Sequence, residues 1–213
     1  MNRSEIKELA KQKIKGNLWN ILWPMLIIEV INIILSSFFG PSIDLTQIKE
    51  MGEMHMSWGS SLGSLAISII TGVLTAGYMM YILKFVRTGK FDTDDIIKTI
   101  KAKWVDLLIA IVLSVIIIGV CSMLLVIPGI IAALGLTMVI FLVIDKDVKG
   151  QDSLKASWEL MKGHKWEYFV FQLSFIGWYL LIPFTLCLIL IWLVPYVTVA
   201  QTIYYDRLVT KKN

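Results

Sequence analysis

The chain contains few charged residues, few cysteines and few histidines for its length of 213 residues. Charged residues make up 17% and hydrophobic residues 57%, whereas a soluble domain has about 25% and about 45–50%, respectively. This balance argues against a water-soluble domain. The two cysteines, Cys121 and Cys187, lie far apart in apolar segments, which excludes a disulfide framework and a cysteine metal site. We expect both to be buried free thiols.

The sequence motifs of several enzyme classes are also absent. The chain has no H-E-x-x-H, no G-x-S-x-G, no P-loop and no G-x-G-x-x-G segment. Zinc peptidases, serine hydrolases and nucleotide-binding enzymes that use these motifs are therefore not indicated. We predict a protein that is not an enzyme and that uses no cofactor and no metal.

Long apolar runs are the main feature that is present. They cover residues 18–39, 62–86, 104–144 and 166–205, and runs of this length are typical of membrane-spanning helices. Each of the last two would be about 60 Å long as one helix, whereas the hydrocarbon core is about 30 Å thick. Each must therefore fold back. We predict the turns at Pro128-Gly129 and at Pro183, because proline ends or kinks a helix.

The resulting prediction is a single all-α membrane domain over residues 1–213, with six transmembrane helices arranged as three hairpins. The spans are 18–39, 62–86, 104–127, 129–144, 166–182 and 183–205, after a basic lead-in at 1–17 and before a tail at 206–213. In this layout all but one of the 20 Lys and Arg residues lie on one side, and only Lys49 lies on the other. The positive-inside rule then places both termini in the cytoplasm. The net charge of +4 is thus explained by the Lys and Arg residues of the predicted cytoplasmic segments. We predict anionic headgroups of the cytoplasmic face as partner and no nucleic acid.

Three basic segments with a similar order of residues precede the odd-numbered spans. They read KQKIKGNLWNIL, KTIKAKWVDLL and ELMKGHKWEYF, and each carries a tryptophan at the membrane boundary: Trp19, Trp104 and Trp166. We interpret them as amphipathic helices whose lysines reach headgroups and whose tryptophan anchors the interface. Duplication of one helical hairpin would explain the pattern, and so would the ordinary enrichment of Trp and Lys at membrane interfaces.

The stretch SWELMKGHKW, at residues 157–166, has the residue types of an active site. Its place between two spans instead predicts a connector on the membrane surface. Asp152 is placed to cap the connector helix, as Asp94 is for the helix before the third span, and Gly163 is suited to end it. The predicted connector residues are Asp152, Trp158, Lys162, Gly163, His164, Lys165 and Trp166.

Glu29 lies midway along the first span, and Asn32 follows one turn later on the same face. An ionisable group at that depth is costly and usually faces a cavity or a partner. Two interpretations stay open. Glu29 is a proton or cation site, or it is a protonated carboxyl bonded to Asn32 or to a nearby Ser or Thr.

Two further patterns lie in the second span and before it. Small residues that recur every four positions form a stripe that lets another helix approach, within the chain or from a second copy. The outer segment MGEMHMSW, at 51–58, could bind Cu(I) through Met and His55 or form an interfacial helix. His55 and His164 lie on opposite sides of the membrane in the predicted layout, so they cannot share a metal. The stripe consists of Ser60, Ser64, Ser68, Gly72 and Ala76.

The C-terminal half resembles a known family. The segments IPGIIAALGLTMVIFLVID, DSLKASWELMKGHKWEYFVFQLSFIGW and PYVTVAQTIYYDRL look like a bacterial family of small integral membrane proteins, the domain of unknown function 975, over about residues 120–208. A more distant likeness is to the membrane domain of some glycerophosphodiester phosphodiesterases. The resemblance implies a multi-pass protein of the bacterial cytoplasmic membrane. It implies no known activity and supplies no catalytic residues.

Two classes of function remain. The first is an accessory protein that serves envelope or lipid homeostasis or a complex with another membrane protein. The second is a small transporter or channel with Glu29 as its ion site. A transporter is expected to place polar groups or broken helices at the midplane, where Glu29 and Asn32 are almost the only polar pair. The sequence therefore favours the accessory protein.

Overall fold

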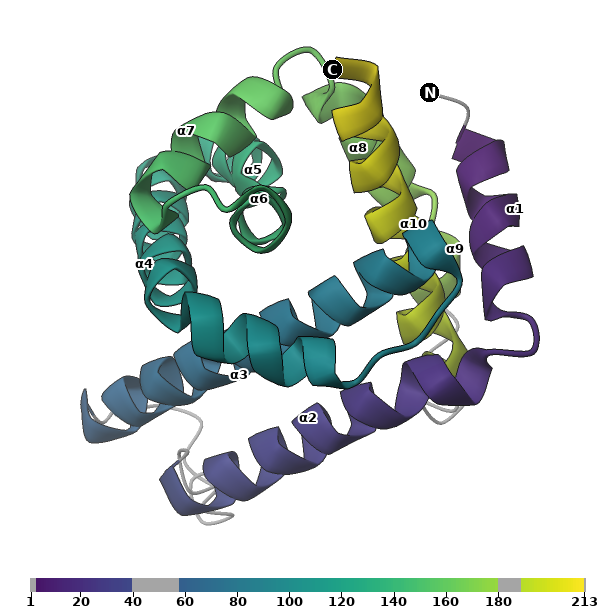
Figure 1. The fold of residues 1–213 in the computed structure, drawn as a ribbon. Helices are drawn as coiled ribbons and strands as arrows, with labels where there is room; N and C mark the ends of the chain where they lie inside the picture. The colour runs from purple at the N-terminus through teal and green to yellow at the C-terminus, as the bar shows by residue number, and fades with distance from the viewer. Residues whose placement is uncertain (1–2, 40–57, 180–188, 213) are drawn as a thin grey trace.

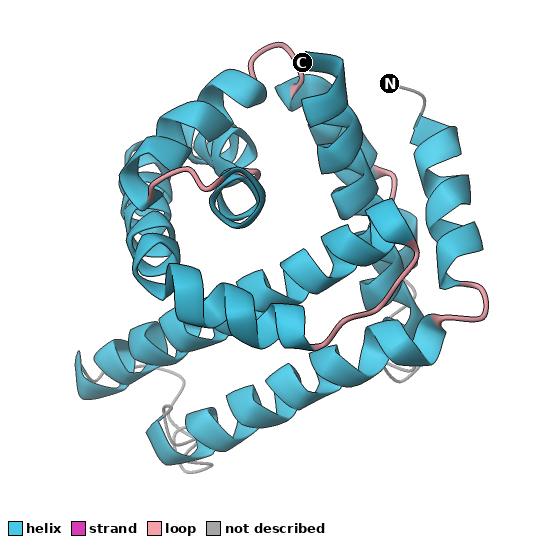
Figure 2. Cartoon of the chain, viewed as in Figure 1, coloured by secondary structure: helices cyan, strands magenta, loops and turns pink. Residues whose placement is uncertain are grey.

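The computed structural model describes residues 3–39, 58–179 and 189–212. These residues form helices joined by turns and short loops, with no strand among them (Figures 1 and 2). The predicted all-α class is confirmed for this part of the chain. The helices are α1 (Arg3–Ile14), α2 (Leu18–Phe39), α3 (Trp58–Thr88), α4 (Asp94–Leu124), α5 (Val126–Leu136), α6 (Val139–Lys146), α7 (Gly150–Leu160), α8 (Lys165–Leu173), α9 (Ile176–Tyr179) and α10 (Leu190–Lys212).

Four segments of the described helices are long and apolar enough to cross a membrane. Only 11% of the apolar window in the α4 segment is buried, against 56% in the segment formed by α5 and α6. The α5–α6 segment is therefore central, and α4 presents most of its apolar surface outward, as a lipid-facing helix does. The four segments are Leu18–Phe38, Gly63–Thr88, Ile96–Met123 and Ile127–Lys146.

The turn between the third and fourth predicted spans lies at Leu125, so the prediction of Pro128-Gly129 is wrong by three residues. Leu125, between α4 and α5, is extended (φ −161°, ψ 149°). Pro128 lies in the first turn of α5, where proline's missing N–H costs no helical hydrogen bond. Gly129 marks the close crossing of α5 on α4, because a Cβ there would lie 2.9 Å from Cα of Ser122.

Helix α6 occupies the centre of the bundle. Figure 1 views it end-on, surrounded by α3, α4, α7 and α10. Its N-terminal end, beside the fully buried Met138, is enclosed by protein, whereas Lys146 at its C-terminal end is exposed. The terminal polar groups of a helix need partners from outside that helix. Its buried side chains are Val139, Phe141, Leu142, Val143 and Ile144.

The C-terminal end of α6 is bonded to three other helices. Arg87 of α3 donates to both carboxylate oxygens of Asp145 and, at 2.7 Å, to Oδ1 of Asp206 on α10. The Tyr205 hydroxyl, also on α10, donates to Oδ2 of Asp145 at 2.9 Å. Lys103 of α4 donates to the last carbonyl oxygens of α6 at 2.6 and 3.2 Å. Because the Asp145 side chain is only 7% exposed, these bonds replace the water that it has lost.

The helices α8 and α9 run antiparallel to α10, joined by contacts between aromatic rings. Tyr168 meets Tyr204 (ring centroids 5.0 Å apart), Phe175 meets Tyr196 (5.4 Å) and Trp178 meets Trp192 (5.5 Å). As the residue number rises on one side of this layer, it falls on the other, which is the geometry of two antiparallel segments. The predicted turn at Pro183 lies outside the described residues.

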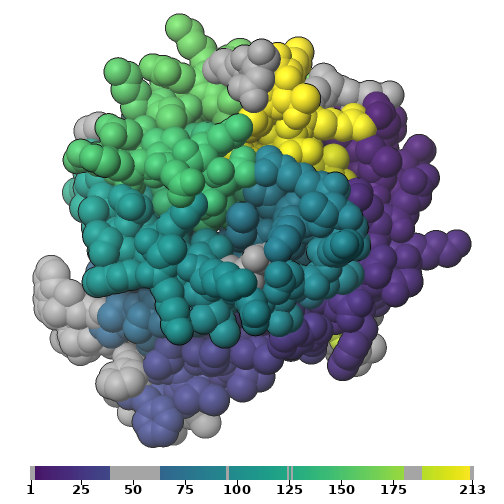
Figure 3. Space-filling model, in the orientation of Figure 1, coloured from purple at the N-terminus to yellow at the C-terminus, as the bar shows by residue number. Residues whose placement is uncertain are grey.

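Helix α1, within the predicted lead-in, is packed into the fold beside α10 (Figure 1), and its atoms lie against those of α10 in Figure 3. Its side chains Ile6, Ala10 and Ile14 are buried. At its polar end, Glu5 pairs with Arg207 (2.5 Å), and this hydrogen bond lowers the pKa of Glu5. The basic lead-in is therefore a docked helix.

The small residues of the second predicted span contribute to the contact of α3 with α4. A Cβ on Gly72 would lie 3.1 Å from Cδ1 of Ile111, and Ala76 is fully buried. Ser64 is half-buried and Ser68 is exposed, while the side chain of Ser60 lies outside the described set. The C-terminal half of the stripe thus packs inside the chain.

Removing the charge of Arg87 alone should destabilise the fold more than removing the charges of both Arg87 and Asp145. In an Arg87→Met variant, Asp145 keeps a buried carboxylate without its main cation. We expect the free energy of unfolding to fall by about 1–3 kcal/mol, less than for a fully buried pair because Arg87 is 36% exposed. Adding Asp145→Asn should restore about 1 kcal/mol, since residues in contact are coupled. Unfolding in detergent micelles, followed by circular dichroism, measures both.

The control for this experiment is Asp92→Asn. Asp92 pairs with Lys84 at 3.1 Å, but both side chains are more than a third exposed. Exposed pairs contribute little to stability, so the unfolding midpoint should barely change. If the effects of Arg87→Met and Asp145→Asn simply add, the two residues do not act as a pair.

Candidate functional site

The connector predicted from SWELMKGHKW is α7, and its serine bridges the break between α5 and α6. The Ser157 hydroxyl donates to the carbonyl oxygen of Gly135 (2.8 Å) and accepts from the N–H of Met138 (3.2 Å). Ser157 is fully buried. One side chain of α7 thus satisfies two main-chain groups that the helix break leaves without helical partners.

The first residues of α7 are held by an acid from α4. Oδ1 of Asp106 accepts the N–H of Gly150 at 3.0 Å. The residue in the N-cap position is Lys149, and its own side chain does not cap the helix by a hydrogen bond. The prediction that Asp152 caps this helix is therefore wrong. A Cβ on Gly150 would lie 2.4 Å from the carbonyl oxygen of Asp106, so glycine lets α7 begin against α4, where Asp106 takes the capping role.

The predicted cap at Asp94 is also wrong, for a local reason. Asp94 is the first residue of α4, and its own N–H donates to Oδ1 of Asp92 at 3.1 Å. The acceptor is thus the acid two residues earlier. This hydrogen bond and, more strongly, the one from Lys84 lower the pKa of Asp92.

The turn from α7 to α8 has the shape that glycine favours. Gly163 has φ +82°, a backbone conformation that other residues rarely adopt. After it, Nδ1 of His164 lies 3.1 Å from Oε2 of Glu167. Helix α7 buries Leu154, Ser157 and Leu160, and Met161 after it is also buried, whereas Lys155, Glu159 and Lys162 are exposed.

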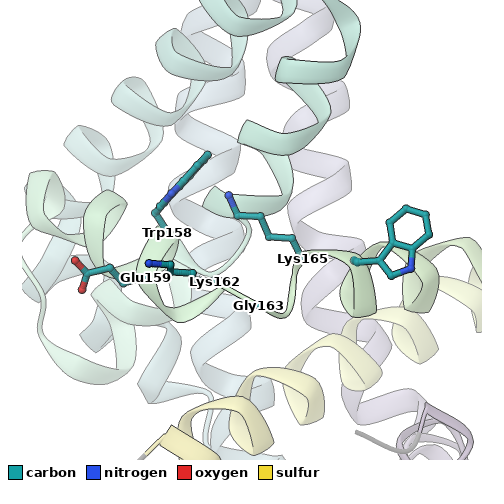
Figure 4. A pocket seen from close by; sticks show the side chains of 6 residues that line it. Trp158, Glu159, Lys162, Gly163 and Lys165 are labelled. Atoms are coloured by element: carbon teal, nitrogen blue, oxygen red, sulfur yellow. The ribbon is translucent and has the colours of Figure 1, made fainter.

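A cation–π contact follows the turn. Figure 4 shows that Lys165 points back toward Trp158, and its Nζ lies 3.0 Å from the centre of the indole ring. Partial burial lowers the pKa of Lys165. Trp158 also lies against α5, because a Cβ on Gly135 would be 2.4 Å from Cε3 of the indole and 3.1 Å from Nζ of Lys165. Gly135, Trp158 and Lys165 are thus stacked in one contact.

Beside this stack lies an open cleft of about 550 Å³. Two ammonium groups and one carboxylate give its lining a net positive charge at neutral pH. Trp158 is 40% exposed and Trp166 73%, and Figure 4 shows the Trp166 ring turned away from Trp158 at the edge of the cleft. Lys162 is exposed and forms no ion pair with a described residue. The lining residues are Trp158, Glu159, Lys162, Gly163, Lys165 and Trp166 (Figure 4).

The other predicted site residues lie elsewhere. Glu29 is exposed on α2 and forms no hydrogen bond with a described residue, and Asn32 is half-buried one turn later. The two are therefore not bonded to one another. Cys121 is a free thiol that is half-exposed rather than buried. The segment 51–57 with His55, and Cys187, lie outside the described residues.

Two residues that shape the site were not predicted from the sequence. Asp106 is the one acid inside a long apolar run, which could have indicated a structural partner. Gly135 has no such signal, because a glycine in an apolar helix is common in membrane proteins. Its role depends on Trp158, which is 23 positions later in the chain.

Substituting Gly135 should disturb the stack through Trp158. A Gly135→Ala methyl group would overlap the indole, and we expect the free energy of unfolding to fall by about 1–3 kcal/mol. In a Trp158→Leu background the same change should cost much less, because the ring is gone. Gly119→Ala on α4 is the control, since no atom lies within 4 Å of its Cβ position and helical alanine is favoured over glycine. An equal loss with and without Trp158 would contradict the contact.

Comparison with known proteins identifies a family without an assigned activity. The family model described as "Protein of unknown function (DUF975)" matches residues 1–138 and 110–212. No curated protein and no solved structure matches the chain, so the more distant likeness to the membrane domain of glycerophosphodiester phosphodiesterases has no support there. Because the two matches together cover nearly the whole sequence, the chain belongs to the DUF975 family of proteins of unknown function.

Proposed function

We propose that this chain is a non-enzymatic, multi-pass protein of the bacterial cytoplasmic membrane that binds anionic phospholipid headgroups at the cytoplasmic face. In this proposal it acts as an accessory protein in lipid or envelope homeostasis, alone or with a membrane protein partner. The observation that carries the proposal is the open cleft beside α7, which two lysines and two tryptophans line.

The proposal includes six spans with both termini in the cytoplasm. It is supported by the meeting of basic residues from distant segments at one end of the bundle. Lys13 donates to the Val86 carbonyl oxygen at 2.9 Å, Arg87 bonds α6 and α10, and Lys103 bonds the end of α6. All are in segments that the layout assigns to the cytoplasm. The antiparallel packing of α8 and α9 on α10 supports the last hairpin.

The chemistry of the cleft fits an anionic headgroup better than a neutral one. Lys162 is free to contact a phosphate, whereas the ammonium of Lys165 is partly engaged by Trp158. Lysine binds phosphate as a point charge. Tryptophan is enriched at the headgroup level of a membrane, because its N–H can bond there to water or headgroups while its apolar ring contacts the lipid. The cleft volume is also within the usual range of small-molecule sites, about 300–1,000 Å³.

The arrangement favours binding without large rearrangement. Helix α7 is fixed at its start by Asp106 and in its middle by Ser157. The turn that follows is set by Gly163. Because these bonds place the lysines and indoles before any ligand arrives, little ordering is required on binding.

Loss of the Lys162 charge should weaken binding of an anionic lipid. The purified protein in neutral detergent is titrated with dioctanoyl phosphatidylglycerol, and binding is followed by native mass spectrometry. We expect Lys162→Gln to weaken the affinity about fivefold, the value for one basic residue worth about 1 kcal/mol at an anionic surface. Dioctanoyl phosphatidylcholine should bind weakly to both proteins.

The matched control is Lys155→Gln. Lys155 is an exposed lysine of α7, seven residues before Lys162, but it does not line the cleft, so its loss should leave the affinity nearly unchanged. Equal weakening by both variants would indicate diffuse attraction to a basic surface, and equal binding of the two lipids would contradict headgroup recognition. Either result would remove the cleft as the site.

A further inference from the structure

We infer that the exposed side of α2 that carries Glu29 is the contact surface between two copies of this chain in the membrane, with hydrogen bonds of Glu29 and Asn32 across it. This inference depends on insertion of α2 into the bilayer and not on lipid binding in the cleft. A negative result for the headgroup site would therefore leave this inference unchanged.

Glu29 lies near the bilayer midplane if α2 spans. The candidate span covers Leu18–Phe38, and Glu29 is 11 residues from its start. At 1.5 Å per residue this is about 16 Å along a hydrocarbon core of about 30 Å. In the other described candidate spans, Lys84, Arg87, Lys103 and Asp145 lie nearer the span ends and bond to neighbours. Asp106 lies ten residues into its span, and it accepts the N–H of Gly150.

The direction of Glu29 is unusual for a residue at that depth. In Figure 1, α2 lies along the edge of the bundle, with Ile21 and Leu22 on its buried face. Glu29, seven residues after Leu22, lies at the edge of this buried face, and its side chain is exposed. Ionisable residues inside membranes nearly always face the bundle interior or a water-filled cavity. In a single copy, Glu29 would instead face lipid.

Exposure to lipid is costly for the carboxyl in either form. The charged form is strongly disfavoured in hydrocarbon, and the neutral form still has an O–H donor and oxygen acceptors that lipid tails cannot satisfy. A polar partner from another molecule removes this cost. Hydrogen bonds between polar side chains are among the interactions that associate helices in membranes.

The α2 face is complementary to itself. Two copies inserted with the same topology are related by a twofold axis along the membrane normal, so their α2 helices pair in parallel and equal residues meet at equal depth. A neutral carboxyl at Glu29 can donate to an amide oxygen and accept from an amide N–H. Asn32, one turn away and half-buried, offers both. The pair on one copy can thus bond to the same pair on the other.

The residues around Glu29 give this face an apolar surface with small residues at one end. Leu26, Val30 and Ile33 are 41%, 53% and 65% exposed, so they can pack against the second copy. Ser36, on the same face, is exposed and small, and it donates its hydroxyl to its own helix at the carbonyl oxygen of Asn32 (2.6 Å). A small residue there lets the two backbones approach.

Energy transfer between labelled copies in liposomes tests the inference. Full-length protein with Cys121→Ser and Cys187→Ser and one added C-terminal cysteine carries donor or acceptor dye, and the protein-to-lipid ratio is varied. We expect wild-type chains to associate. Glu29→Leu should need about 3- to 30-fold higher density for half-association, the range for interhelical hydrogen bonds in membranes. Glu29→Gln, which keeps a donor and an acceptor, should stay near wild type.

A matched pair of tryptophan variants locates the surface. Val30 on α2 and Val115 on α4 are equally exposed, at 53% and 52%. Val30→Trp should weaken association by steric conflict, and Val115→Trp should not. Glu29→Leu makes α2 more apolar, so it does not oppose insertion. A wild-type chain that is monomeric at every density, unchanged association of Glu29→Leu, or equal effects of the two tryptophans would each overturn the inference.

Discussion

The nearly buried carboxylate of Asp145, at the C-terminal end of α6, is the constraint on which the rest of the fold depends. A helix end has carbonyl groups without helical partners, and α6 also ends in a carboxylate that is only 7% exposed. Neither can be left unbonded in an interior that has little water. Arg87, Lys103 and Tyr205 meet this need from α3, α4 and α10. The polar groups near this end of α6 thus fix the relative positions of four helices and gather charge at one end of the bundle.

The connector helix α7 is also held by side-chain hydrogen bonds to main-chain groups at helix ends. The break between α5 and α6 is closed by the Ser157 hydroxyl, and the start of α7 is capped by Asp106 from α4. Each bond joins segments that are separated along the chain, so α7 cannot shift without exposing main-chain groups. The stack of Lys165 on Trp158 extends this fixed surface to the cleft. Structural hydrogen bonds therefore supply the rigidity that a binding site needs.

Features that depend on hydrophobic periodicity or on neighbouring residues could be predicted from the sequence. Contacts between residues far apart in the chain could not. Long apolar runs predicted the helices, and Gly163 predicted the turn that follows α7, although the helix itself ends three residues earlier, at Leu160. Asp152 was the nearest acid to the start of α7, but Asp106 reaches it from 44 residues earlier. Pro128 was placed in a turn, yet proline is equally suited to the first turn of a helix. The stack against Gly135 needed coordinates, since nothing near Gly135 in the sequence indicates Trp158.

Three acids within or beside apolar runs have different environments in the structure. Asp106, Asp145 and Glu29 each lie within or at the edge of an apolar run. The first two find donors inside the chain, at Gly150 and at Arg87, and their cost of burial is met by the fold itself. Glu29 is exposed on the outermost helix and finds no donor among the described residues. All three carboxyl groups incur a desolvation cost when they leave water for an apolar environment. Where the fold does not meet that cost, a second molecule must, and this makes the α2 face a contact surface between chains.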